Sequence, residues 1–239
     1  MSEAALVLAL AVLGGVAFLD RTALVQTMMS RPLVSGTLAG YLAGAPGAGM
    51  ACGALLELLW LFDLPVGTAV PPDESTAGVV GAAVAAALAG AWGLAASVGA
   101  GVTAGCAAGI FGGRADVWVR RWNDGLVPRA REALAAGRLD GVGRFHWLGV
   151  LRFFGVGVAV SLVGVAAGRS GAWVLADMGP GLRQGFELVG VTLPVVGAAA
   201  CLGGLRSVRA RPWFVAGFAA VGFGPRLLLW TREVAPWRS

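Results

Sequence analysis

The stretch from Pro32 to Gly113 contains no Lys, Arg or His, and its only charged residues are four carboxylates. Over the whole chain of 239 residues, 13% are charged and 57% are hydrophobic. A soluble domain carries about a quarter charged residues, so this chain has too few for a surface that meets water. The sequence therefore predicts an all-α integral membrane protein, a bundle of transmembrane helices whose outer surface contacts the lipid bilayer.

The basic residues are all Arg, and they give the chain a net charge of +5. A basic chain can bind nucleic acid, but these residues lie mostly at the ends of apolar segments and between them. That placement is typical of contacts with anionic lipid headgroups and of the positive-inside rule. We therefore expect no nucleic-acid partner.

The apolar blocks differ in length from simple spanning helices, which need about 20 residues. The first, residues 4–19, has no basic residues before it, so we expect a retained helix and not a cleaved signal peptide. Residues 33–62 are too long for one span, and the Gly44–Gly47 stretch should split them. Residues 77–113 are too long for one span and too short for two. Further spans are expected at residues 147–168, 186–205 and 213–230.

Interrupted or re-entrant segments are the natural solution for the two blocks of unusual length. Broken helices occur at membrane depth only where the backbone is buried in protein or lines a wet cavity. Short segments interrupted by Gly or Pro therefore indicate a transport site. Within the second block, small residues recur every four positions, which predicts close helix packing; they are Gly93, Ser97, Gly101, Gly105, Gly109 and Gly113.

Residues 114–146 are hydrophilic and contain seven Arg and four acidic residues. Trp118 and Trp122 are four residues apart and share a helix face. This pattern predicts an amphipathic helical arm, anchored by Trp at the headgroups, and its Arg excess places it in the cytoplasm. We accordingly expect three regions: residues 1–113 with the site, residues 114–146 as the arm, and residues 147–239 as further transmembrane helices.

Glu57 is the most informative of the carboxylates, because it lies within an apolar run of helical length. Ionisable residues in membrane segments are functional candidates by default. Glu57 and Trp60 share a helix side, and a carboxylate beside an indole ring suits a sugar. The carboxylate accepts hydrogen bonds from hydroxyl groups, and the ring packs on the C–H face. The alternative is a structural Glu bonded to the N-terminus of a broken helix.

Asp73 follows two prolines and precedes an apolar helix, so it has two interpretations of equal weight. It can cap the helix N-terminus, or it can contact substrate at a polar helix end within the membrane. Asp63 and Glu74 are expected at a loop or an edge. The three cysteines and His146 are expected to be structural, and no metal, cofactor or catalytic residue is predicted.

Three ordered segments resemble one protein family. They are RPLVSGTLAG at residues 31–40, GALLELLW at residues 53–60 and PVGTAVPPD at residues 65–73. Their order and spacing resemble the IIC subunit of phosphotransferase-system permeases of the mannose/fructose/sorbose family. The resemblance in motifs covers roughly residues 6–80, and the later chain is similar only in its helix pattern and polar arm.

The resemblance implies a multi-pass subunit of the bacterial inner membrane that binds and translocates a hexose-type sugar. It implies a IID membrane partner, a homo- or hetero-oligomer, and IIA and IIB components that carry the phosphoryl group. The sugar is then phosphorylated as it is released inside, with no phosphoryl-carrying residue on this chain. The residues that the resemblance assigns to the substrate are Glu57, Asp73, Thr68, Gln26 and Arg31.

One departure from the family pattern leaves other functions open. The family commonly has Gly-Asp after the first segment, whereas here Gly44 is followed by Ala45. A polar group is therefore missing near the expected turn. The alternative functions are a regulatory or scaffold subunit of an incomplete phosphotransferase system, which does not transport, and an unrelated small-solute channel.

Overall fold

The computed structural model describes residues 1–24, 26–61, 70–204, 212 and 215–216. Within them the chain is helical and contains no strand, which confirms the predicted all-α fold. Four helical stretches are long and apolar enough to cross a membrane: Glu3–Thr22, Glu74–Ala135, Asp140–Ala176 and Pro180–Leu202. The helices are α1 (Glu3–Thr22), α2 (Pro32–Leu42), α3 (Pro46–Trp60), α4 (Glu74–Trp92), α5 (Leu94–Asp124), α6 (Leu126–Ala135), α7 (Leu139–Ala176) and α8 (Pro180–Gly204).

The predicted break in the block 33–62 is confirmed, because α2 and α3 form a short helical hairpin. The chain turns at Gly44, whose φ of +78° favours glycine, and α3 then begins at Pro46. With 11 and 15 residues, the two helices are roughly 16 and 22 Å long, less than the hydrocarbon thickness of about 30 Å. A Cβ on Gly49 would lie 2.5 Å from the Cα of Gly40, so only glycine permits this approach.

The block 77–113 forms two full helices, which corrects the expectation that it is too short for two. Helix α4 begins earlier, at Glu74, and α5 continues through the polar residues to Asp124. The break falls at Gly93, where φ is +75°. The small residues of α5 face the backbone of α4: a Cβ on Gly101 would lie 2.6 Å from the Gly81 carbonyl oxygen. The expected close packing is therefore present.

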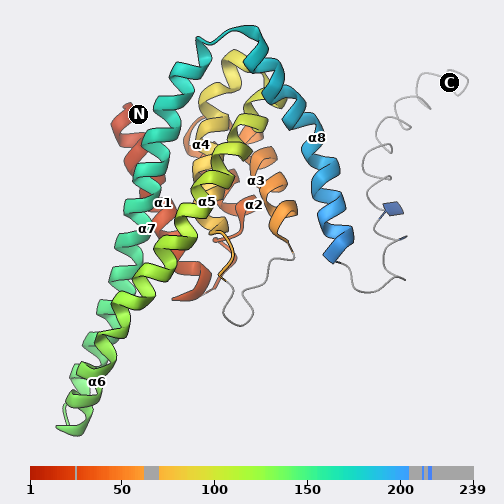
Figure 1. Cartoon of the computed structure of the whole chain (residues 1–239). Helices are drawn as coiled ribbons and strands as arrows, with labels where there is room; N and C mark the ends of the chain where they lie inside the picture. The colour runs from red at the N-terminus through yellow and green to blue at the C-terminus, as the bar shows by residue number, and fades with distance from the viewer. Residues whose placement is uncertain (25, 62–69, 205–211, 213–214, 217–239) are drawn as a thin grey trace, which may run out of the picture.

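The arm consists of the C-terminal part of α5, helix α6 and the N-terminal part of α7, which together project from one end of the bundle (Figure 1). No helix ends at residue 113 or 146, because α5 and α7 run from the apolar bundle into the arm without a break. The rings of Trp118 and Trp122 lie 5.2 Å apart, as expected for one helix face.

Figure 1 shows how the other helices are placed around this frame. Helices α4 and α5 form the centre, α1 and α7 pack together on one side, and α8 descends beside α5 and α3 on the other. Helix α7 supplies the expected span 147–168, and α8 supplies the span expected at 186–205. The last expected span, residues 213–230, lies outside the described residues apart from residues 215–216.

Candidate functional site

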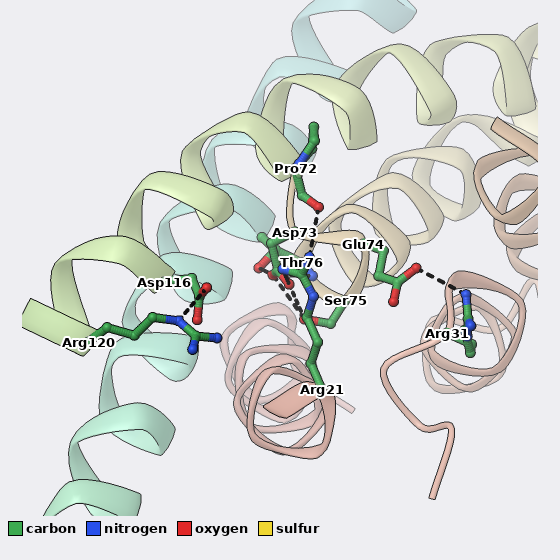
Figure 2. A network of polar contacts seen from close by, with 9 residues as sticks. All are labelled: Arg21, Arg31, Pro72, Asp73, Glu74, Ser75, Thr76, Asp116 and Arg120. Carbon is green, nitrogen blue, oxygen red and sulfur yellow. Dashed lines mark hydrogen bonds and ion pairs between the residues drawn. The ribbon is translucent and has the colours of Figure 1, made fainter. Parts of the chain in front are cut away.

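Charged side chains gather where α1 ends and where α2 and α4 begin, near the last turns of α3 (Figure 2). These helix ends lie towards the end of the bundle from which the arm projects (Figure 1). The charges form two adjacent groups. We call Arg31, Glu57 and Glu74 the Arg31 cluster, and Arg21, Asp73, Ser75 and Thr76 the Asp73 cluster.

The Arg31 cluster joins three helices. Arg31 precedes α2, and its Nη1 lies 3.5 Å from Glu57 Oε1 of α3 and 3.4 Å from Glu74 Oε2 of α4. The three side chains are partly accessible, with exposed fractions of 32% for Arg31, 19% for Glu57 and 18% for Glu74. Glu57 Oε2 also accepts a hydrogen bond from the Leu33 N–H at 3.3 Å, so Glu57 does bond to the N-terminus of a broken helix.

The Asp73 cluster is closed. Asp73 is fully buried and forms an ion pair of 3.1 Å with Arg21. Its Oδ2 accepts a hydrogen bond of 2.9 Å from the Thr76 N–H, which is the helix cap expected from the sequence. The hydroxyl groups of Ser75 and Thr76 donate to the same carboxylate. Arg21 also donates to the Pro72 carbonyl oxygen at 3.4 Å.

The two clusters offer different chemistry to a ligand. An ionised carboxylate only accepts hydrogen bonds and a guanidinium group only donates them, whereas a sugar hydroxyl does both. The partly exposed side chains of Arg31, Glu57 and Glu74 therefore present both kinds of partner to a polyol. The carboxylate of Asp73 is buried and already accepts hydrogen bonds from Arg21, Ser75 and Thr76. In this arrangement it is not available to a ligand and instead fixes the first turn of α4.

The other residues assigned from the sequence lie around these clusters or outside the described residues. Trp60 is partly buried, and its ring lies against Gly109 of α5. Gln26 is exposed in the connection between α1 and α2, with a φ of +57°. Thr68 and Asp63 lie outside the described residues. Glu74 was expected at a loop or an edge, but it lies in the first turn of α4 and belongs to the Arg31 cluster.

The sequence analysis missed two charged residues of this region. Arg21 supplies the positive charge for Asp73, although the two are far apart in the sequence. Asp20 is buried and accepts hydrogen bonds from the Thr27 and Ser30 N–H groups. It thereby holds the loop that leads to Arg31. The sequence feature that could have indicated both residues is the charged pair Asp20-Arg21, which directly follows the first apolar block.

Comparisons with known proteins bear on the family and the fold of the chain. The sequence model of the family described as "PTS system sorbose-specific IIC component" matches residues 2–229. A relative, the fructose permease IIC component of Bacillus subtilis (strain 168), is 26% identical over 197 residues, which cover 81% of this chain and 70% of the relative.

Two solved structures share the fold. One, described as "Structure of membrane protein", has a TM-score of 0.69 at 21% identity and covers 99% of this chain and 98% of its own. The other is the mannose transporter ManYZ in complex with microcin E492, with a TM-score of 0.54 at 23% identity. It covers 99% of this chain and 97% of its own. Among the described residues, no group of three His, Cys, Asp or Glu side chains is placed to hold a metal ion.

Proposed function

The chain belongs to the family of sorbose-specific IIC components of the phosphotransferase system, and we propose from this that it is the sugar-translocating subunit of a phosphoenolpyruvate-dependent permease. Its substrate is a hexose-type sugar, which crosses the bilayer on this subunit and is phosphorylated by a partner IIB component. As a multi-pass protein with no phosphoryl-carrying residue of its own, it depends on IIA and IIB for that chemistry.

The Arg31 cluster supports this proposal most directly. Glu57 lies at the open end of a hairpin too short to cross the bilayer, and its carboxylate is partly accessible. We assign Glu57 as the acceptor for sugar hydroxyls, Arg31 as the donor, and Trp60 as the ring beside the sugar. Asp73 positions the first turn of α4, and Gln26 and Thr68 remain predicted contacts from the adjoining connections.

The side on which the cluster lies also fits the proposal. The Arg excess of residues 114–146 predicts that the arm is cytoplasmic, and the Arg31 cluster lies towards the same end of the bundle. A sugar bound there is near the compartment in which a IIB component acts. We therefore propose a IID membrane subunit and the IIA and IIB components as partners in a hetero-oligomer of the inner membrane.

The test is uptake by the assembled system. The chain is co-expressed with its IID partner and IIB component in a host without hexose permeases, and phosphoenolpyruvate-dependent accumulation of phosphorylated hexoses is measured. We expect accumulation with the wild-type chain and none with Glu57→Gln, at equal amounts of membrane-inserted protein. Wild-type uptake by Glu57→Gln and by Glu57→Ala would contradict the assignment of the site.

A regulatory subunit that does not transport is the second candidate, and one observation favours it. The residue before α3 is Ala45, whose side chain makes no capping hydrogen bond, whereas the family pattern has Asp at this turn. The tip of the hairpin therefore lacks a polar group. If no hexose accumulates although the complex is intact in the membrane, this second function is supported instead.

A further inference from the structure

An apolar groove of about 700 Å³ lies between α5 and α7, with α4 as its floor. Helix α5 contributes Ala107 and Phe111, and α7 contributes Val163 and Gly168. Apart from Thr76 of α4, every side chain lining the groove is apolar. Phe111 and Val163 are 63% and 68% exposed, so among the described residues the walls are uncovered.

A positive charge lies just beyond the arm-side end of the groove. Arg114 follows Phe111 by three residues, on the same side of α5, and its guanidinium carbon lies 5.8 Å from the Phe111 ring centre. The carboxylate next to it in sequence, Asp116, pairs with Arg120 at 2.9 Å instead. Within the described part of the chain, no carboxylate lies within ion-pair distance of Arg114.

The depth of Arg114 matches a membrane surface. Helix α5 rises about 30 Å between Leu94 and Arg114, which equals the hydrocarbon thickness of a bilayer. Trp118 and Trp122 follow, with exposed fractions of 56% and 47%, and exposed Trp is enriched at headgroup depth. Arg114 therefore lies where the phosphates of the arm-side leaflet lie.

The length of the groove distinguishes a lipid from a partner helix. Its walls extend from Phe111 to Ala104 on α5 and from Ala159 to Gly168 on α7, which is roughly 10–14 Å. That is about one leaflet, half of the 30 Å hydrocarbon core. A spanning helix of a partner would need a contact surface along the whole core, whereas an acyl chain of one leaflet needs half of it.

We propose that this groove binds one anionic phospholipid of the arm-side leaflet, with an acyl chain between α5 and α7 and its phosphate on Arg114. Basic pockets between transmembrane helices on the cytoplasmic side are suited to anionic headgroups. The first turn of α4 lies beneath the groove, where Thr76 is fully buried and donates a hydrogen bond to Asp73. The lipid thus packs behind the Asp73 cluster.

Binding is measured on the purified full-length chain by native mass spectrometry, with phosphatidylglycerol and phosphatidylcholine titrated separately. We expect one phosphatidylglycerol to bind more tightly than phosphatidylcholine. Arg114→Gln should weaken phosphatidylglycerol about fivefold, the effect of one basic residue at a membrane surface. Arg129→Gln, which removes an exposed Arg of α6, is the matched control and should change nothing.

The groove itself is tested by filling it. Ala107 is exposed within the groove, so Ala107→Leu should displace the lipid without disturbing the core, whereas Ala199→Leu at an exposed position of α8 should not. Equal binding of both lipids, or unchanged binding in Arg114→Gln and Ala107→Leu, would overturn the proposal. So would a photoreactive residue at position 107 that captures a membrane protein instead of a lipid.

Discussion

The Asp73 cluster and the Arg31 cluster are neighbours, yet they place carboxylates in opposite environments. Asp73 and Glu74 are consecutive, but Asp73 is fully buried and Glu74 keeps 18% of its side chain exposed. Asp73 has four hydrogen-bond donors from its own cluster. Glu74 shares Arg31 with Glu57. A closed cluster stabilises the fold, whereas an open one keeps hydrogen-bonding capacity for a ligand.

The difference follows from the position of each residue at the start of α4. Asp73 is the cap, so its side chain turns back to the first N–H groups of the helix and packs beside Gly112 of α5. Glu74 is the first helical residue and points instead to α2 (Figure 2). A step of one residue along the chain therefore separates a structural carboxylate from an available one.

The largest effect that would test this comparison concerns transport. We expect Glu57→Gln to lower sugar uptake by at least about 100-fold, because the proposed assignment gives Glu57 two charge-assisted hydrogen bonds to the sugar, each worth about 1.5 kcal/mol. The thermal unfolding temperature of the purified protein should change little, since Glu57 is partly exposed. Uptake kinetics and thermal unfolding measured on the same preparations check both parts. A large loss of stability would show that Glu57 belongs with the closed cluster.

The next largest effect concerns stability. Asp73→Ala leaves the guanidinium of Arg21 buried without its partner, and breaking a buried ion pair costs about 3–5 kcal/mol. We expect a lower unfolding temperature and less protein in the membrane. Asp73→Asn also removes the ion pair with Arg21 but keeps the helix cap, so the difference between the two variants measures the contribution of the cap. Stable protein with abolished uptake in both variants would instead make Asp73 a substrate contact.

A smaller effect should come from the hairpin that carries Glu57. Gly49→Val forces side-chain atoms against the backbone of α2 and should destabilise the protein by about 1–3 kcal/mol, the usual cost of overpacking. Gly47→Ala lies in the same helix but has no atom within 4 Å of its new Cβ, so it should be nearly neutral. Equal unfolding temperatures for the two variants would show that the hairpin does not depend on this close contact.

The smallest expected effect is a gain. Ala45→Asp supplies the missing cap of α3 and should raise stability by about 1 kcal/mol, the usual contribution of a capping residue. Thermal unfolding measures the gain, and Ala45→Asn separates capping from charge. If sugar uptake appears only in Ala45→Asp, the natural chain has lost transport at the hairpin tip, and the regulatory function gains support.

Much of the fold could be predicted because it depends on local rules. The charge-free stretch indicated membrane helices, and Gly44 with Pro46 indicated the break between α2 and α3. The cap at Asp73 followed from the two prolines before it. The length of α5 was not predicted, because polar residues after Gly113 ended the apolar block although helix propensity continued to Asp124.

The site could be predicted only in part, because its ion pairs join distant segments. Glu57 was singled out because an ionisable side chain within an apolar run is energetically costly, and its contact with substrate stays a prediction. Arg21 could not be assigned to Asp73, since 52 positions separate them and only the packing of α1 beside α4 brings them together. Glu74 was misjudged for the same reason: its partner Arg31 precedes a helix whose direction the sequence does not specify.

The unbroken course of α5 has a mechanical consequence. One end of this helix belongs to the arm, and its glycines from Gly105 to Gly113 press against the backbone of residues 71–77. Because α5 is one continuous helix from the bundle into the arm, a displacement of the arm also displaces the glycines that pack against residues 71–77. A protein that binds the arm can therefore shift the part of α5 that packs against Asp73 without contacting the Arg31 cluster.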